Sequence, residues 1–134
     1  MIRAYLDMAA DMFHIGHLNL IKRSRNMSDY LIVGVHSDLD IASYKRLPII
    51  PEYDRYEIVR CCKYVDEVIT SAPLSITKEF IEENKINVVI RGDDKTPEIM
   101  EQLKVPMEMG IVKFLPRTEN ISTSDIIRKI KESK

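Results

Sequence analysis

The chain has 134 residues, of which 45% are hydrophobic, and its formal net charge is −1 at pH 7. This length favours a single domain over residues 1–134, with a core that needs no disulfide or metal cross-link. The balanced charge excludes a general attraction to nucleic acid or to an anionic membrane, and no apolar run resembles a signal peptide or a membrane span. We therefore expect a cytoplasmic protein with neither nucleic acid nor a membrane as its partner.

The first half of the chain alternates apolar runs of strand length with amphipathic segments. A strand is expected over residues 2–6, and a helix over residues 14–27 follows it. Residues 30–35 form a continuous apolar run, as in a strand that is covered on both faces. A helix over residues 53–63 and a short strand over residues 65–69 come next. The side chains expected to face the core are Ile15, Leu18 and Ile21 in the first helix and Ile58, Val59 and Cys62 in the second.

The second half continues the same alternation. A helix is expected to begin near Ser75, followed by a strand over residues 86–90 and a final strand over residues 111–115. Proline and glycine interrupt residues 100–110, which predicts a short helix and then a loop. A closing helix is expected over residues 122–131. The inward-facing side chains of these helices are expected to be Ile76, Phe80 and Ile81, and then Ile126, Ile127 and Ile130.

Strands that alternate with helices predict the α/β class. The specific expectation is a single Rossmann-like domain, an open parallel five-stranded sheet with helices on both faces. In such sheets ligands bind beyond the carboxyl ends of the strands. Chemistry is therefore expected in the loops that follow Leu6, Val35, Ile69, Ile90 and Leu115.

The segment between the first strand and the first helix carries a phosphate-binding pattern. His14 and His17 lie three residues apart, so they share one face of the first helical turn, and Gly16 lets a ligand approach the backbone. Free amides at a helix N-terminus attract phosphate, and two imidazoles there can donate hydrogen bonds to a phosphoryl group that gains charge. The pair is alternatively incidental, or part of a metal site. A zinc site needs further ligands, for which Cys61, Cys62 and His36 are the candidates, and their spacing does not support it.

Two further motifs lie at other strand ends. The segment 117–125 (RTENISTSD) precedes the last helix, where Ser122 or Thr123 is a natural N-cap and Arg117 offers a planar donor fork for phosphate oxygens. Asn120 in this segment tolerates a left-handed backbone. The segment 91–94 (RGDD) follows the INVVI strand, and its paired acids can orient a substrate or help to hold a metal. The simpler interpretations are a well-capped helix and a polar turn.

Taken together and in this order, the three motifs resemble the cytidylyltransferase family. That family includes the enzymes for glycerol 3-phosphate, ethanolamine phosphate and choline phosphate. The resemblance covers nearly the whole chain. The H-x-G-H pattern is shared with other nucleotidyltransferases, whereas R-T-x-x-I-S-T-S over residues 117–124 is much more specific. Residues 30–38 and 64–69 are also similar to this family.

The resemblance implies roles for individual positions. Catalytic roles are implied for His14, His17, Lys45 and Arg117, which would contact the CTP phosphates and stabilise the transition state. Nucleotide contacts are implied for Ala9, Ala10, Asp11, Gly16, Asp94, Arg117, Thr118, Ile121, Ser122 and Thr123, and acceptor contacts for Arg46, Arg55 and Asp66. The resemblance also implies Mg²⁺ with the CTP, and a homodimer.

The chain departs from the family pattern at three places. Met8, Ala9 and Ala10 stand where the family has a glycine, a small or polar residue and an aromatic residue, so only backbone contacts are expected there. Asn120 stands where a glycine usually precedes I-S-T. Lys95 stands where the glycerol-phosphate enzymes have tryptophan, which bears on the choice of acceptor.

The expected activity is transfer of CMP from CTP to a small phosphorylated alcohol, with release of pyrophosphate. The absence of Trp argues against an aromatic cage for a quaternary ammonium, and Lys95, if it faces the acceptor, would repel an ammonium group. Glycerol 3-phosphate is therefore the first expectation, then ethanolamine phosphate or a phosphonate, then choline phosphate. The alternatives are an adenylyltransferase of the same superfamily, a fragment of an aminoacyl-tRNA synthetase, or a catalytically silent nucleotide-binding module.

Overall fold

The computed structural model describes residues 1–119 and 121–133. Asn120, and with it the expected left-handed conformation, lies outside the described residues. The elements are β1 (Arg3–Met8), α1 (Ile15–Asn26), β2 (Tyr30–Val35), α2 (Asp38–Ala42), α3 (Glu52–Arg60), β3 (Glu67–Thr70), α4 (Lys78–Glu83), β4 (Val88–Gly92), α5 (Pro97–Gln102), α6 (Lys104–Glu108), β5 (Val112–Leu115) and α7 (Thr123–Glu132).

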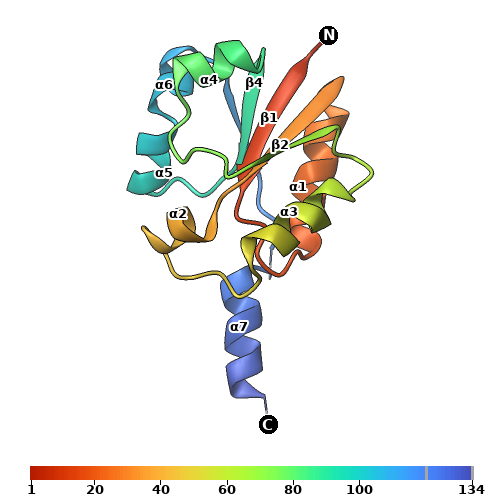
Figure 1. Cartoon of the computed structure of the whole chain (residues 1–134), viewed down its shortest axis with the longest axis vertical. Helices are drawn as coiled ribbons and strands as arrows, with labels where there is room; N and C mark the ends of the chain where they lie inside the picture. Colours follow the sequence, from red (N-terminus) through yellow and green to blue (C-terminus); the bar gives the residue numbers. More distant parts are fainter. Residues whose placement is uncertain (120, 134) are drawn as a thin grey trace.

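The strands form one parallel five-stranded sheet in the order β3-β2-β1-β4-β5 (Figure 1). The chain therefore moves outward from β1 to one edge, returns across the sheet to β4 and ends at the other edge. Parallel neighbours need crossover connections, and helices supply them. The expected α/β fold with an open five-stranded sheet is confirmed.

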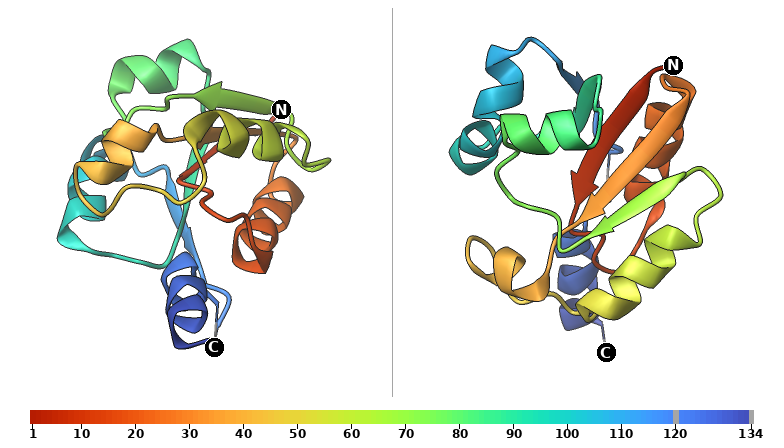
Figure 2. Two further views of the ribbon diagram at one scale, coloured as in Figure 1. Left: turned by 60° about the horizontal axis from the view of Figure 1, so that its bottom comes forward. Right: turned by 45° about the horizontal axis from the view of Figure 1, so that its top comes forward.

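Helices cover both faces of the sheet (Figure 2). On one face, Leu6 of β1 packs in a core with Ile21 of α1 and Val59 of α3. On the other face, Tyr5 of β1 packs in a second core with Ile81 of α4. Successive side chains of a strand point to opposite faces, so neighbouring residues of β1 supply two different cores. This explains why β1 and β2 are apolar throughout rather than alternating.

The structure differs from the expected elements mainly in the helices. Residues 100–110 do not form a helix and a loop; two short helices, α5 and α6, occupy this part of the chain. Thr96 caps α5, and Pro97 occupies its first turn, where proline lacks only an amide that would be unpaired anyway. The strand expected over residues 65–69 begins later, at Glu67.

Several side chains expected to face the core are exposed. The exposed fractions are 52% for Ile15, 45% for Ile58 and 63% for Ile130. The prediction for these three isoleucines was wrong. Ile130 is exposed because α7 begins over the carboxyl edge of the sheet and then extends away from it (Figure 1), so only its Thr123 is buried.

The carboxyl ends of all five strands lie along one edge of the sheet, because every pairing is parallel and β1 and β2 are in register from Arg3 with Tyr30 to Met8 with Val35. The segments that follow β1, β2, β4 and β5 meet at this edge. The N-terminus of α7 lies there too. Among the described residues, no helix is long and apolar enough to cross a bilayer.

Candidate active site

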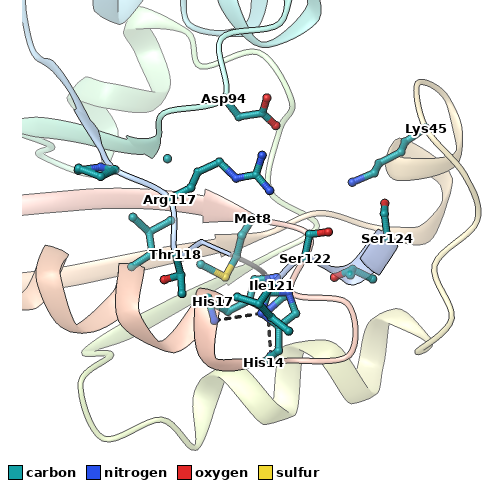
Figure 3. A pocket seen from close by; sticks show the side chains of 15 residues that line it. Met8, His14, His17, Lys45, Asp94, Arg117, Thr118, Ile121, Ser122 and Ser124 are labelled. Carbon is teal, nitrogen blue, oxygen red and sulfur yellow. Dashed lines mark hydrogen bonds between the residues drawn. The ribbon is translucent and has the colours of Figure 1, made fainter. Parts of the chain in front are cut away.

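Two adjoining cavities lie at the carboxyl edge of the sheet. The first has a volume of about 460 Å³ and is lined by the start of α1, the segment after β5 and the start of α7 (Figure 3). The second has a volume of about 220 Å³ and lies beside the loop after α2 and the end of β4. The residues that line both are Met8, His17, Leu20, Lys45, Gly92, Asp94 and Thr123. The two cavities therefore share a boundary at which ligands bound in each would meet.

The side chains of His14 and His17 cap the start of α1 by accepting hydrogen bonds from backbone amides. The Nδ1 atom of His14 accepts a hydrogen bond from the Gly16 amide at 3.0 Å, and the Nδ1 atom of His17 accepts one from the His14 amide at 3.1 Å (Figure 3). The two rings are stacked with their centroids 3.9 Å apart. Because each Nδ1 accepts from a backbone amide, the proton of each neutral ring resides on Nε2. Each imidazole is thus prepared as an Nε2–H donor at the first cavity.

Both imidazoles are held in the neutral state. Burial lowers the pKa of His14. Burial, and then the neighbouring His14, lower the pKa of His17 to about 4, although Asp11 acts in the opposite direction. At neutral pH the two rings therefore donate hydrogen bonds without carrying charge, and the positive charge at this site comes from other residues.

Gly16 is required by the close approach of the backbone to the His14 ring. A Cβ atom at Gly16 would lie 2.8 Å from Cε1 of His14, well inside van der Waals contact. The preceding loop is also tightly bent, since Ala10 and Met12 have φ values of 57° and 51°. The local backbone thus places His14 at the N-cap of α1.

Asp11 connects three loops of the site. Its carboxylate accepts hydrogen bonds from the amides of Ile49 and Ile50, both at 2.9 Å, and its carbonyl oxygen accepts one from the Thr123 hydroxyl at 2.9 Å. Nη2 of Arg46 lies 3.9 Å from the same carboxylate. Asp11 therefore fixes the loop that carries Lys45 and Arg46 against the N-terminus of α7.

The segment after β5 forms the other wall of the first cavity. Thr118 accepts a hydrogen bond from Asn19 of α1 at 3.1 Å, and Ser122 caps α7 by accepting one from the Asp125 amide at 3.0 Å. Arg117 and Lys45 lie on the same cavity (Figure 3). Burial and then the neighbouring Arg46 lower the pKa of the Lys45 ammonium. The cavity thus combines cationic side chains with the amides at the starts of two helices, which suits a chain of phosphates.

The structure brings most of the expected site residues together. The first cavity is lined by His14, Gly16, His17, Lys45, Asp94, Arg117, Thr118, Ile121, Ser122 and Thr123, and the second by Ala9, Asp11 and Arg46 as well as the shared residues. Ala10 is 1% exposed and lines neither cavity.

Arg55, expected at the acceptor, lies elsewhere. Its side chain is fully buried and lines neither cavity. The guanidinium donates to the carbonyl oxygens of Ile50 (2.9 Å), His36 (2.8 Å) and Ala9, and to the carboxylate of Asp38 at 2.7 Å. All three of its nitrogens are thus engaged within the protein, where they join the segments that follow β1 and β2.

Asp66 is separated from both cavities. It immediately precedes β3, at the opposite edge of the sheet from the carboxyl ends. Its carboxylate accepts a hydrogen bond from the Leu31 amide at 2.8 Å and lies 3.3 Å from Nε of Arg25. The structure does not bring Asp66 to the acceptor region.

Three buried polar residues that line the second cavity form a network that the sequence did not predict, although His36 was considered as a zinc ligand and Arg91 begins the RGDD segment. Oδ2 of Asp7 lies 3.1 Å from Nε2 of His36, and Oδ1 of Asp7 lies 2.6 Å from Nη2 of Arg91. Burial opposes the ionisation of Asp7, but Arg91 and His36 more than compensate, so the pKa of Asp7 is lowered. The available signal was Arg91 at the end of an apolar strand, where a charged side chain has to find a partner or a ligand.

The acidic groups do not form a metal cage. No group of three or more His, Cys, Asp or Glu side chains placed to hold a metal occurs in residues 1–119 and 121–133. Asp94 is the carboxylate that lines the first cavity and also the second. Magnesium is commonly held by one or two carboxylates together with substrate phosphates. Asp94 is therefore the residue that would hold a magnesium ion arriving with a nucleotide.

Solved structures share the fold of this chain. A lipopolysaccharide core biosynthesis protein from Thermoplasma volcanium superposes with a TM-score of 0.72 at 25% identity, over 90% of this chain and 99% of that protein. Pantothenate synthetase from Thermus thermophilus superposes with a TM-score of 0.62 at 13% identity, over 94% of this chain and 61% of that enzyme, which supports the fold alone.

Sequence relatives identify the family. The chain is 41% identical over 132 residues to ethanolamine-phosphate cytidylyltransferase from Dictyostelium discoideum, covering 94% of this chain and 37% of that protein. It is 38% identical over 136 residues to human choline-phosphate cytidylyltransferase A, covering 96% of this chain and 36% of that protein. The chain thus spans little more than a third of these relatives. A family profile described as Cytidylyltransferase-like matches residues 9–129, and the chain belongs to this family.

Proposed function

We propose that this chain transfers CMP from CTP to a small phosphorylated alcohol and releases pyrophosphate. One observation carries the proposal: His14 and His17 are fixed as neutral Nε2–H donors on a cavity that also holds Lys45, Arg117 and the N-terminus of α7. Such an arrangement stabilises a phosphoryl group that gains negative charge. The names of the relatives support the same reaction class.

In this mechanism an oxygen of the acceptor phosphate attacks the α-phosphorus of CTP in line. The bond between the α-phosphorus and its bridging oxygen to the β-phosphate breaks, and pyrophosphate leaves with the electron pair. His14 and His17 donate hydrogen bonds to the phosphoryl oxygens, while Lys45 and Arg117 neutralise charge on the triphosphate. Magnesium bound with the nucleotide and Asp94 would supply further charge neutralisation. No nucleophilic side chain is required, so catalysis consists of positioning and charge stabilisation.

The preferred acceptor changes from glycerol 3-phosphate to ethanolamine phosphate. Glycerol 3-phosphate was the first expectation because a lysine after the paired aspartates would repel an ammonium group. Nζ of Lys95, however, lies 4.6 Å from the centroid of the Phe114 ring and 3.5 Å from Asp93, and Lys95 lines neither cavity. The charge of Lys95 is therefore not placed to repel an ammonium group of the acceptor. Relatives named for ethanolamine phosphate favour that acceptor, and we place it first.

Choline phosphate remains the weaker candidate. A trimethylammonium group is recognised by a cage of several aromatic faces. Among the described residues that line the second cavity, Tyr44 is the only aromatic side chain other than the two histidines. A primary ammonium can instead be held by hydrogen bonds to ordinary acceptors, because it has three N–H donors and needs no aromatic cage.

We also propose that the protein is a homodimer, as its resemblance to the family implies, and that it works in the cytoplasm. Multi-angle light scattering of the purified chain tests the first proposal. A mass of twice the 15.6 kDa chain supports it, and a monomer at working concentrations contradicts it.

The activity is tested by pyrophosphate release with each of the four nucleoside triphosphates against ethanolamine phosphate, glycerol 3-phosphate and choline phosphate. The proposal predicts release with CTP, fastest with ethanolamine phosphate. Faster release with ATP would support the adenylyltransferase alternative. CTP binding without release in every combination would support the silent nucleotide-binding alternative, for which Met8, Ala9 and Ala10 are the sequence argument.

A further inference from the structure

Arg91 lies at the floor of the second cavity and has no part in the mechanism above. It belongs to β4, is 9% exposed and lines this cavity but not the first. Its Nη2 atom lies 2.6 Å from Oδ1 of Asp7, an ionic contact without the alignment of a hydrogen bond. Asp7 is itself held by His36. The guanidinium is therefore anchored at one nitrogen by a buried carboxylate.

Two guanidinium Nε atoms at the second cavity lack hydrogen-bond partners in the part of the chain that the structure describes. Nε of Arg91 and Nε of Arg46 are both buried without a hydrogen-bond partner among the described residues, and both side chains line the second cavity. Buried donors are nearly always paired, and an unpaired one costs free energy. Both Nε atoms are enclosed by the protein, so a ligand in the cavity would reach the two guanidinium groups through the nitrogens that are not enclosed in this way, Nη1 of Arg91 and the Nη atoms of Arg46.

The carboxylates of the cavity are already engaged. Asp7 lies between Arg91 and His36, and the oxygens of Asp11 accept the amides of Ile49 and Ile50. Asp94 lies at the boundary with the first cavity. The residues that line the second cavity thus carry three cations, Lys45, Arg46 and Arg91, against three carboxylates, and guanidinium donors of this kind suit a phosphate or phosphonate.

We propose that Arg91, together with Arg46, binds the phosphate of the acceptor in the second cavity and holds it toward the α-phosphate of the nucleotide. This inference rests on the proposed function and gives a role to Arg91, the first residue of the RGDD segment, for which the sequence assigned a role only to the paired acids; Arg46 was already expected at the acceptor. His17 and Lys45 line both cavities, so an anion at the two arginines lies next to the site of transfer. Asp7 is a positioning residue that fixes Arg91.

A competing explanation gives Arg91 a structural task alone. The guanidinium would then serve only to neutralise Asp7, which is 2% exposed. Removing Arg91 by itself would leave this carboxylate buried without its cation, which destabilises proteins strongly. The test therefore needs a variant that removes both charges, and a variant that keeps the cation.

The variants are Arg91→Lys, the double variant Asp7→Asn/Arg91→Gln, and Asp7→Asn as its matched background. Arg60→Gln is the surface control, because Arg60 is more than half exposed and pairs with the exposed Glu57. Steady-state kinetics give KM for ethanolamine phosphate and for CTP. Calorimetry gives the affinity for inorganic phosphate in protein saturated with α,β-methylene-CTP, which fills the nucleotide site without turnover.

Replacing Arg91 is expected to raise KM for ethanolamine phosphate about 10–100-fold. The affinity for inorganic phosphate should fall by a similar factor, as for loss of a charge-assisted hydrogen bond. The affinity for CTP should stay within about twofold, and Arg91→Lys should recover part of the loss. Equal phosphate affinity in Asp7→Asn and in the double variant would overturn the assignment, as would a loss of CTP affinity equal to the loss of phosphate affinity. If wild-type protein binds inorganic phosphate through Arg91 but releases no pyrophosphate, the proposed function fails and the anion site stands.

Discussion

The Nδ1 atom of His17 accepts the backbone N–H of His14 at 3.1 Å, so one histidine of the H-x-G-H pattern caps the other. The same contact directs the remaining ring proton of His17 to Nε2, at the boundary of the two cavities. The spacing of the pattern thus has a geometric reason: a residue at the third helical position can reach back to the N-cap amide.

Replacing His14 or His17 by alanine is expected to lower kcat about 100–1,000-fold, because each loses one preorganised donor to the transferring group. The measurement is pyrophosphate release with CTP and ethanolamine phosphate, with circular dichroism to establish that each variant is folded. Turnover near that of the wild type in either folded variant would rule out the assigned role.

The stability of the protein should fall as the pH is lowered from about 6.5 to about 4. The pKa of His17 is lowered from 6.5 to about 4 in the folded state, so in this window the unfolded chain binds more protons than the folded one. His17→Asn keeps an acceptor for the His14 amide but cannot titrate. Urea unfolding should show the wild type losing about 1–3 kcal/mol more than His17→Asn between pH 7 and pH 4.5. Parallel losses in the two proteins would contradict the lowered pKa.

Arg55→Ala is expected to destabilise the fold by about 3–5 kcal/mol, as for removal of one partner from a buried charged network. The variant leaves the carbonyl oxygens of Ala9, His36 and Ile50 without their donor. Arg60→Ala is the matched control, and its exposed ion pair should contribute less than about 1 kcal/mol. A stable Arg55→Ala protein with a raised KM for the acceptor would instead support direct contact with the substrate.

CTP with Mg²⁺ is expected to raise the melting temperature, and ATP should raise it much less. A ligand present at about 100 times its dissociation constant adds about 2.7 kcal/mol of stability. Differential scanning fluorimetry with each nucleotide measures the shift, and Arg117→Gln should reduce the shift for CTP because it removes a cation from the first cavity. A larger shift with ATP would contradict the choice of nucleotide.

The fold and the nucleotide side of the site were accessible from sequence, because they depend on local patterns. Apolar runs such as residues 30–35 identify buried strands, and a polar motif after such a strand lies at the carboxyl edge. The acceptor side depends on three-dimensional packing. Arg55 in α3 and Arg91 in β4 are both buried arginines, yet one is enclosed by carbonyl oxygens and the other lines a cavity. In α7 the apolar periodicity predicted the helix, but periodicity does not say whether the sheet covers that face, and Ile130 is exposed.

Cytidylyl transfer is tested most directly by ³¹P NMR of the purified chain with CTP, Mg²⁺ and ethanolamine phosphate. The signals of CTP and ethanolamine phosphate should decline together, while those of CDP-ethanolamine and pyrophosphate grow in equal amounts. His17→Ala should slow this conversion about 100–1,000-fold. Unchanged CTP after long incubation of folded protein with ethanolamine phosphate, glycerol 3-phosphate and choline phosphate in turn would contradict the assignment as a cytidylyltransferase of phosphorylated alcohols.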